Sequence, residues 1–296
     1  MVASAPPTLS LCILCHDRPA ELLDALASVA DEPWHEVLVL DMASDPPISP
    51  VRGVEWLRSD ENVGVTGGRN QLAHRATGEI LVFLDDDAVL LTPGAGQRLQ
   101  AAFADAPRLG VVAFRVRRPS GTGAGPSLEY PFRGSGTRSG ARDSARPCAY
   151  FVGCGYAIRR DAQLAVGGYD DRFFYSTEEV DLSFRLLGDG WQLRYEPSIE
   201  VEHRPSTRGR ARTGSAVPGW RLRNRLLLAR AHLPLAVAMP HVAVWTARTA
   251  LEAARARSVG TWWRLGREGL SLPVRRRPLG WRLLLRIHRI GGRVLY

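Results

Sequence analysis

The sequence predicts an α/β protein in which a sheet is flanked by helices and followed by a basic helical extension. Two observations carry this prediction. Over residues 1–115, short apolar runs alternate with segments of helical spacing, the order that produces strands joined by right-handed helical crossovers. From residue 204 onward there are 20 Arg and two Glu, whereas the preceding residues carry more acidic than basic side chains. An acidic α/β body is therefore joined to a strongly basic tail.

Length and composition narrow the class of protein. The 296 residues allow one large domain or two modest ones, each with a hydrophobic core. Hydrophobic residues make up 45% and charged residues 23%, which fits neither a disordered polypeptide nor a polytopic membrane protein. Four Cys are too few for a disulfide framework, and the first ten residues lack the pattern of a secretory signal. We therefore expect a cytoplasmic protein.

The elements of the first 115 residues follow one another regularly. Strands are expected over 9–14, 37–40, 54–57, 79–84 and 111–116, and helices over 18–29, 71–76 and 99–103. Glycines within 62–70 would form a tight turn before the helix at 71–76, although this segment lacks the spacing and the Lys of a P-loop. Because ligands bind beyond the carboxyl ends of parallel strands, we expect a nucleotide-binding-like unit.

The rest of the body is less regular. Residues 117–147 are rich in Gly, Ser, Arg and Pro without periodicity, so we expect a flexible loop or lid there. Ordered elements are expected again at 150–159, as a helix at 177–187, and as strands at 192–195 and 199–203. From residue 220 onward the pattern is helical.

Three consecutive aspartates, Asp85, Asp86 and Asp87, end the apolar strand at 79–84. Alternation along a strand places Asp85 and Asp87 on one side and Asp86 on the other. Two carboxylates that face one point repel unless a cation lies between them, and a hard divalent ion prefers oxygen ligands. We expect a metal and nucleotide site here, with a solvated acidic turn as the alternative.

A second acidic cluster opens the helix at 177–187. Asp181 lies one turn before Arg185 and can pair with it, while Glu178 shares their face and Glu179 points about a quarter-turn away. Two interpretations of Glu179 stay open. With Ser176 it matches a capping box, which would only satisfy the helix start. Alternatively, the helix dipole keeps it ionised and able to accept a proton.

His203 and the cysteines are weaker signals. A lone His is usually structural, yet an imidazole is a good third ligand beside carboxylates for a Mn-type ion. We expect no zinc or redox site from Cys12, Cys15, Cys148 and Cys154. Residues three apart in a strand face opposite sides, and the second pair has five residues between its members, unlike a compact zinc knuckle.

Taken in order, these motifs resemble the family 2 glycosyltransferases, which have the GT-A fold, and most closely their bacterial rhamnosyltransferase-like branch. The resemblance runs from about residue 9 to residue 224. It is carried by the turn Cys15-His16-Asp17-Arg18, Asp41, the run from Asn62 to Glu79, Asp85-Asp86-Asp87, Gly153-Cys154-Gly155, Gly167-Gly168-Tyr169-Asp170, and Glu178-Glu179-Val180-Asp181-Leu182 with Arg185. Several motifs in the right order are far more specific than any one alone.

The resemblance implies a GT-A type, Rossmann-like mixed sheet and a catalytic domain over residues 1–219. Its nucleotide-binding half would be 1–115, its flexible loop 117–147 and its acceptor half 148–219, before an Arg-rich helical tail over 220–296. The implied function is an inverting, metal-dependent glycosyltransferase. Such an enzyme moves a sugar from a nucleoside diphosphate of uridine, thymidine or guanosine to an acceptor hydroxyl on a glycan, a lipid-linked molecule or a natural product.

It also implies roles for individual residues. Glu179 would be the catalytic base, although the family usually carries Asp there, and the supporting residues would be Glu178, Asp181 and Arg185. A Mn or Mg ion would be held by Asp85, Asp87 and His203. Contacts to the nucleotide sugar would come from Cys15, His16, Arg18, Asp41, Asn62, Gly64, Gly68, Arg69, Asn70, Asp85 and Asp86. Among these, Asp41 would accept from the base, while Gly64 and Gly68 would let the backbone approach the nucleotide.

The tail predicts cationic amphipathic helices. Arg282, Arg286, Arg289 and Arg293 recur at helical spacing beside an apolar stripe of Leu283, Ile287, Ile290 and Val294. With Trp262, Trp263 and Trp281, this pattern suits the surface of an anionic membrane. Two alternatives stay open: a packing helix with a solvated Arg face, and a tail that binds a soluble anionic acceptor.

Other classes of function explain less of the sequence. A nucleic-acid-binding protein would explain the tail but not the acidic clusters, so we expect no nucleic-acid partner. A nucleotidyltransferase would need a Gly-rich signature with Arg or Lys near the first strand, which the turn at 15–18 does not supply. A catalytically inactive relative stays possible because Glu179 replaces the usual Asp.

Overall fold

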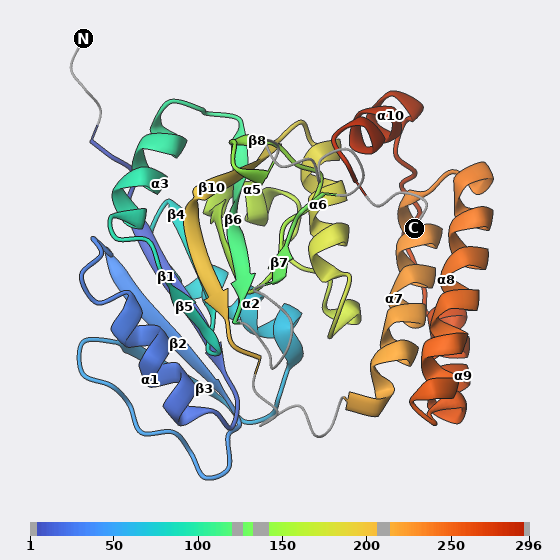
Figure 1. The fold of residues 1–296 in the computed structure, drawn as a ribbon, viewed down its shortest axis with the longest axis horizontal. Helices are drawn as coiled ribbons and strands as arrows, with labels where there is room; N and C mark the ends of the chain where they lie inside the picture. The colour runs from blue at the N-terminus through green and yellow to red at the C-terminus, as the bar shows by residue number, and fades with distance from the viewer. Residues whose placement is uncertain (1–4, 120–126, 133–141, 206–213, 293–296) are drawn as a thin grey trace.

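A mixed β-sheet of ten strands forms the centre of the computed structural model, which describes residues 5–119, 127–132, 142–205 and 214–292 (Figure 1). Along the sheet the strands are β3 (Glu55–Ser59), β2 (Glu36–Met42), β1 (Leu9–Cys15), β4 (Ile80–Asp85), β9 (Gly155–Arg159), β6 (Leu109–Arg118), β10 (Gln192–His203) and β5 (Ala88–Leu90). Two short strands lie beside this path: β7 (Ser127–Glu129) pairs with β6, and β8 (Arg146–Pro147) pairs with β10.

Most strands run in one direction. β3, β2, β1 and β4 pair in parallel, β9 is antiparallel to both β4 and β6, and β10 is parallel to β6. The carboxyl ends of β1, β2, β4, β6 and β10 therefore meet at one edge of the sheet. This is the edge where an open α/β sheet binds its ligands.

Helices cover both faces of the sheet, each over its own core. On one face, α1 (Pro19–Ser28) and α3 (Ala95–Ala104) bury apolar side chains against alternate residues of β1 and β4. On the other face lie α2 (Gly64–Arg75), α5 (Arg160–Ala165) and α6 (Glu178–Gly188), over the side chains that β1 and β4 point the opposite way. The predicted α/β class with a helix-flanked mixed sheet is confirmed.

The helix expected at 71–76 begins seven residues earlier, so only the first of the glycines expected in the turn before it lies at that turn. Gly64 opens α2 with a φ of +74°, and Gly67 and Gly68 lie inside the helix. A Cβ at position 68 would lie 2.7 Å from Leu14 Cδ2. The absence of a side chain at Gly68 therefore lets α2 pack closely against β1. Close packing thus outweighs the poor helix propensity of glycine.

Two further expectations need correction. The strands expected at 192–195 and 199–203 are one strand, β10, with a bulge between Glu196 and Glu200. The segment 117–147 is not simply a loop: β7 extends the sheet, and Phe132 is 3% exposed within the core. An aromatic residue within a polar stretch has enough apolar surface to join the core. Positions 120–126 and 133–141 of that prediction lie outside the described residues.

The tail is helical, as expected, and comprises α7 (Val217–His232), α8 (Leu235–Arg255), α9 (Val259–Ser271) and α10 (Trp281–Arg289). Helix α7 lies between α6 and the pair α8 and α9 (Figure 1), and its Leu227 and Leu228 join the core over the sheet. Among the described helices, none combines the length and the apolar character needed to cross a bilayer.

The apolar stripe of α10 packs on the body and does not face outward. Ile287 is fully buried in the core, and Leu283 and Ile290 pack against it, while Arg282 and Arg286 are exposed. The alternative of a packing helix with a solvated Arg face is therefore correct for this helix. Arg293 and Val294, which complete the two predicted stripes, lie outside the described residues.

Candidate active site

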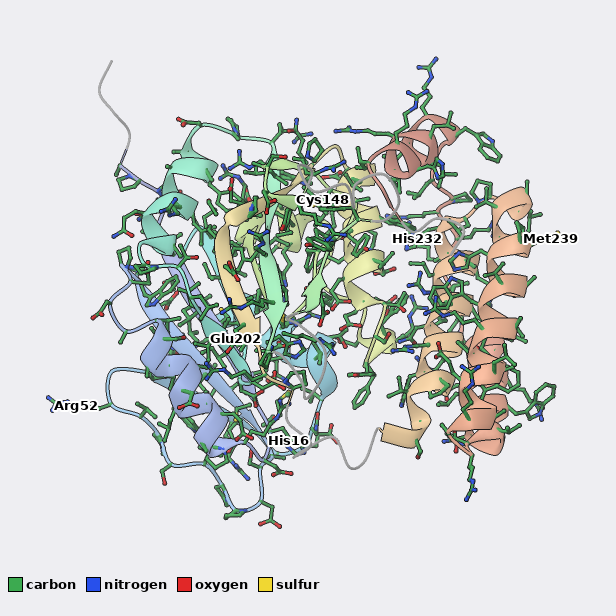
Figure 2. All side chains as sticks on the ribbon, in the orientation of Figure 1. His16, Arg52, Cys148, Glu202, His232 and Met239 are labelled. Atoms are coloured by element: carbon green, nitrogen blue, oxygen red, sulfur yellow. The ribbon has the colours of Figure 1, made fainter. Side chains whose placement is uncertain are left out.

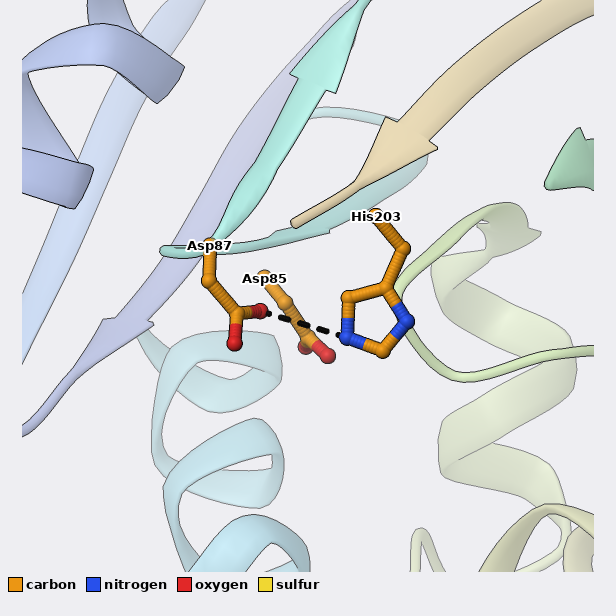
Figure 3. A group of neighbouring side chains, drawn as sticks. All are labelled: Asp85, Asp87 and His203. Carbon is orange, nitrogen blue, oxygen red and sulfur yellow. Dashed lines mark ion pairs between the residues drawn. The ribbon is translucent and has the colours of Figure 1, made fainter. Parts of the chain in front are cut away.

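Asp85, Asp87 and His203 meet at the carboxyl ends of β4 and β10 (Figure 3). Asp85 is the last residue of β4, and the antiparallel pairing of β5 with β10 places His203 opposite Ala88, next to Asp87. One ligand atom from each residue lies within 4.8 Å of the others, and His203 Nε2 is 3.4 Å from Asp87 Oδ1. Two carboxylates and an imidazole in this arrangement form a donor set that suits Mn²⁺ or Mg²⁺.

Glu129 on β7 orients the imidazole of His203 from the other side. Its Oε1 lies 3.5 Å from His203 Nδ1 and also pairs with Arg118. Burial opposes a charged imidazole, but its interactions with the accepting carboxylates of Asp87 and Glu129 outweigh burial and raise the pKa of His203 to about 9. A carboxylate behind a ligating imidazole is a common second partner at metal sites. Glu129 was missed by sequence reasoning because it lies in the segment expected to be a loop.

Asp86 lies outside this group. Strand β4 ends at Asp85 and residues 86–87 form a turn, so the expected strand alternation does not extend to Asp86. Its Oδ1 lies 3.0 Å from Arg18 Nη1, which is also 2.6 Å from Asp87 Oδ2, and the backbone N–H of His16 donates to Asp86 Oδ2. Burial is the main cause that raises the pKa of Asp86 to about 7. Asp86 and Asp87 are 2% and 5% exposed, which excludes the solvated acidic turn. The turn at 15–18 therefore contacts Asp86 and Asp87 directly.

Arg69 joins this edge of the sheet to the second acidic cluster. Its Nη2 donates to the carbonyl oxygen of Gly153 at 2.7 Å and lies 3.3 Å from Asp85 Oδ1. A Cβ added at Gly153 would lie 2.4 Å from Glu179 Oε1 and 2.9 Å from Arg69 Nη2. The Glu179 carboxylate therefore lies against Gly153, next to the guanidinium of Arg69.

Glu179 does not act as a helix cap. Helix α6 starts after Thr177, whose φ is +77°, and no side chain accepts a hydrogen bond at this cap. The capping-box interpretation is therefore wrong, because the left-handed backbone at Ser176 and Thr177 removes the geometry that a capping box needs. Burial raises the pKa of both Glu178 and Glu179, so the expectation that the helix dipole holds Glu179 ionised is also wrong in direction.

Asp181 is held by two side chains, and one of them was expected. Arg185 pairs with it through Nη2 at 2.6 Å, as the spacing predicted, and His232 of α7 places Nε2 2.7 Å from Asp181 Oδ1. Burial would raise the pKa of Asp181, but the hydrogen bond from His232 and the charge of Arg185 outweigh it and hold that pKa below its ordinary value. The start of α6 is thereby attached to the tail.

One cavity of about 910 Å³ connects these groups. Asp85 and His203 line one side, Glu178 and Glu179 line another, and the wall contributed by α7 consists of Val217, Arg221 and Arg225. The volume of the cavity lies within the range of small-molecule sites. Its α7 wall was not predicted, because the sequence assigned residues from 220 onward to a separate tail.

Several residues expected to contact the nucleotide have internal partners instead. Asp41 is fully buried and accepts from the backbone N–H of Ser44 at 3.0 Å and from Arg58. Asn70 bonds the backbone of Tyr169 through both its amide oxygen and nitrogen. Asn62 accepts from the backbone N–H of Gly64. These contacts shape the surrounding loops, and direct contact with a nucleotide stays a prediction for all three.

The four cysteines are free, buried thiols. Burial raises the pKa of each one, which makes them poor ligands and nucleophiles. Within the described part of the chain, the group formed by Asp85, Asp87 and His203 is the one cluster with ligand atoms close enough to hold a metal ion.

Relatives of known name share parts of this sequence. An O-antigen biosynthesis protein RfbC from Myxococcus xanthus is 25% identical over 69% of this chain and 18% of its own length. An N-acetylglucosaminyl-diphospho-decaprenol L-rhamnosyltransferase from Mycobacterium tuberculosis is 45% identical over 20% of each chain. A pre-mycofactocin glycosyltransferase from the same species is 31% identical over 51% of this chain and 32% of its own. The chain thus spans at most about a third of these relatives.

Solved structures share the fold. GalNAc-T7 with UDP, GalNAc and Mn²⁺ aligns with a TM-score of 0.64 at 16% identity, over 88% of this chain and 56% of that one. The mannosyltransferase PcManGT from Pyrobaculum calidifontis, in complex with GDP-Man and Mn²⁺, aligns at 0.52 and 15% identity over 97% and 80%. The family model described as Glycosyl transferase family 2 matches residues 10–164, more than half of the chain. The chain has the GT-A fold and belongs to glycosyl transferase family 2.

Proposed function

We propose that the protein is an inverting, metal-dependent glycosyltransferase that moves a sugar from a nucleoside diphosphate sugar to an acceptor hydroxyl. The observation that carries this proposal is the shared cavity, which is lined by Glu179 and by Asp85 and His203 of the group that Asp87 completes. The Mn²⁺ and nucleotides in the similar solved structures support the same assignment. The donor is a uridine, thymidine or guanosine diphosphate sugar.

The residues divide the chemistry between two sides of the cavity. Glu179 takes the proton of the acceptor hydroxyl while that oxygen attacks the anomeric carbon, and its raised pKa makes the carboxylate a stronger base. The bond from the anomeric carbon to the diphosphate breaks on the opposite side, so the configuration inverts. Arg69 lies between the two sides and holds Asp85 in place.

The metal site lies where the leaving group departs. Asp85, Asp87 and His203 would hold the ion, and the contact between Glu129 and His203 Nδ1 orients the ring of His203. When bound, a divalent ion neutralises the charge that grows on the departing diphosphate. Arg18 pairs with both Asp86 and Asp87 and so offsets the repulsion between these two carboxylates.

Thermal unfolding against a panel of nucleoside diphosphates and their sugars, each with and without Mn²⁺, tests the donor site. One nucleotide should raise Tm in a Mn²⁺-dependent way, since a ligand that binds only the folded state stabilises it. Asp87→Ala should lose this shift. Glu179→Gln should keep it but lose turnover by about 100-fold or more. Full turnover in Glu179→Gln, or no shift with any nucleotide, would contradict the proposal.

We also propose that the enzyme works at an anionic membrane surface, through α8 and α9. Among the described residues, nine of the ten large exposed hydrophobic side chains lie within 235–285. Four of them, Leu235, Met239, Val244 and Leu251, are on α8, and Met239 projects outward from its far side (Figure 2). An exposed apolar patch of this kind on a soluble body marks an interaction surface.

The charge around this surface favours an anionic lipid bilayer as its partner. Glu252 and Glu268, which are the acidic residues of the tail, pair internally with Arg221 and Arg223. Ten further Arg side chains between residues 255 and 289 are exposed. Apolar side chains surrounded by Arg match the interface of an anionic bilayer. The name of the mycobacterial rhamnosyltransferase, which includes a decaprenol, supports an acceptor presented by a membrane.

Vesicle sedimentation tests this surface. The protein should bind vesicles of phosphatidylcholine with phosphatidylglycerol, less so at high salt, and much less as Leu235→Glu with Met239→Glu. Leu23→Glu is the matched control, because Leu23 is 55% exposed but lies on α1. Absence of binding, or equal loss in the control, would overturn the proposal. A dimer that the α8 variant dissociates would instead assign the surface to a second copy.

A further inference from the structure

Glu178 and Glu179 follow an irregular segment with an unusual backbone. Phe174, Ser176 and Thr177 have φ values of +33°, +70° and +77°, in a region that residues other than glycine rarely occupy. Such conformations persist only where the surroundings enforce them, and they concentrate at functional sites. Because this segment leads directly into α6, its conformation decides where the Glu179 carboxylate lies.

One buried side chain of α7 binds this segment. The amide nitrogen of Asn224 donates to the carbonyl oxygens of Phe173 at 2.8 Å, Tyr175 at 2.7 Å and Ser176 at 2.6 Å. An amide has two N–H donors, so the three carbonyls share them. Asn224 is fully buried, and its oxygen accepts from Arg223 Nη1 at 2.9 Å, which fixes the orientation of the amide.

Two neighbours on the same face of α7 extend this contact. Trp220 stacks on Phe174 with ring centroids 5.3 Å apart, and His232 lies 2.7 Å from Asp181. Residues 220, 224 and 232 are separated by four and eight positions, so they lie on one side of the helix. Together they hold the chain before and after Glu179, while Asn224 is the member that bonds the strained backbone itself.

We propose that Asn224 is a positioning residue for glycosyl transfer, which holds residues 173–176 so that Glu179 faces the cavity. This rests on the role of Glu179 proposed above. The hydrogen bonds of Asn224 go to the carbonyl oxygens of residues 173, 175 and 176 and to Arg223, so its effect is confined to the segment that precedes Glu179. Misplacement of a reacting group by about 1 Å can cost about 100-fold in rate. Loss of Asn224 should therefore lower kcat and leave donor binding intact.

Steady-state kinetics of the full chain test this proposal, with release of nucleoside diphosphate from the donor sugar as the assay. Asn224→Asp keeps the size of the side chain and removes both N–H donors, so kcat should fall about 100-fold. The donor KM should change less than about 3-fold, since the metal group is untouched. Asn224→Ser introduces no charge, keeps one hydroxyl donor and should give an intermediate kcat.

Leu222→Ala is the matched control on the same helix. Leu222 is 4% exposed and contacts Gly266 of α9, away from the segment before α6. It should lower Tm with kcat nearly unchanged. Wild-type kcat in folded Asn224→Ser, or an equal loss of kcat in Leu222→Ala, would overturn the positioning role. Glu179→Gln measured alongside separates the two proposals: if it is active the base assignment fails, and if only the Asn224 variants are active this inference alone fails.

Discussion

The two acidic clusters of the cavity are held in place by different means. Asp85 and His203 end strands whose ladders continue through β1, β4, β6 and β10, so many backbone hydrogen bonds fix their positions. Glu179 follows an irregular segment that depends on a few side chains of α7. A distributed support tolerates single substitutions, whereas a support of few contacts does not. Glu179, the proposed base, is therefore the more vulnerable part of the site.

The largest effect, on the free energy of unfolding, is expected at Asp181, in the helix that carries Glu179. Asp181→Asn removes the charge that Arg185 and His232 share, which for a buried pair costs about 3–5 kcal/mol of folding free energy. The folded pKa of Asp181 is below its ordinary value, so this stabilisation is present above about pH 4 and lost as pH falls through the folded value. Chemical denaturation between pH 3 and pH 7 should show the two proteins converge in acid; a constant difference would contradict the assignment.

Gly153→Ala tests the position of the Glu179 carboxylate and should leave the protein folded. Its Cβ would lie 2.4 Å from Glu179 Oε1 and 2.9 Å from Arg69 Nη2, and both are ends of long side chains that can move. Displacement of the base should lower kcat by about 100-fold, or about 2.7 kcal/mol on the barrier. Mn²⁺-dependent binding of the nucleoside diphosphate should persist, and its loss would place Gly153 in the nucleotide site instead.

The smallest effect is expected at Gly68, on the better supported side. In Gly68→Ala the new Cβ would lie 2.7 Å from Leu14 Cδ2, and such overpacking costs about 1–3 kcal/mol. The better helix propensity of Ala offsets about 1 kcal/mol of this cost. Gly68→Ala should therefore lower the free energy of unfolding by about 1 kcal/mol and leave kcat and nucleotide affinity unchanged. A large loss of nucleotide affinity would contradict this expectation and support the predicted role of Gly68 beside the nucleotide.

The metal group was also easier to predict from the sequence than the contacts that position Glu179. Asp85 and Asp87 were expected together from strand alternation, and they do lie together, although Asp87 stands in the turn that follows β4. The place of His203 beside them was implied by the family resemblance. The pair of Asp181 and Arg185 follows from helical spacing, a prediction that needs only the period of one element.

The remaining contacts are long-range and leave no local pattern. Asn224 is 48 to 51 residues from the carbonyls it binds, and His232 is 51 residues from Asp181. Glu129 lies in a stretch whose composition suggests a loop. The start of α2 was missed because glycine propensity is local, whereas its packing against Leu14 is tertiary. Only the folded chain shows that the basic tail forms one wall of the cavity.

The placement of Asn224 also sets an order of events during synthesis. A chain emerges from the ribosome with its N-terminal part first, and structure forms as residues become available. Every member of the metal group has emerged by residue 203, whereas Asn224 and His232 follow 21 and 29 residues later. The residues of the proposed metal group therefore all precede the side chains that anchor the segment before Glu179. A nascent chain halted between these points would carry the metal group without the contacts that position Glu179.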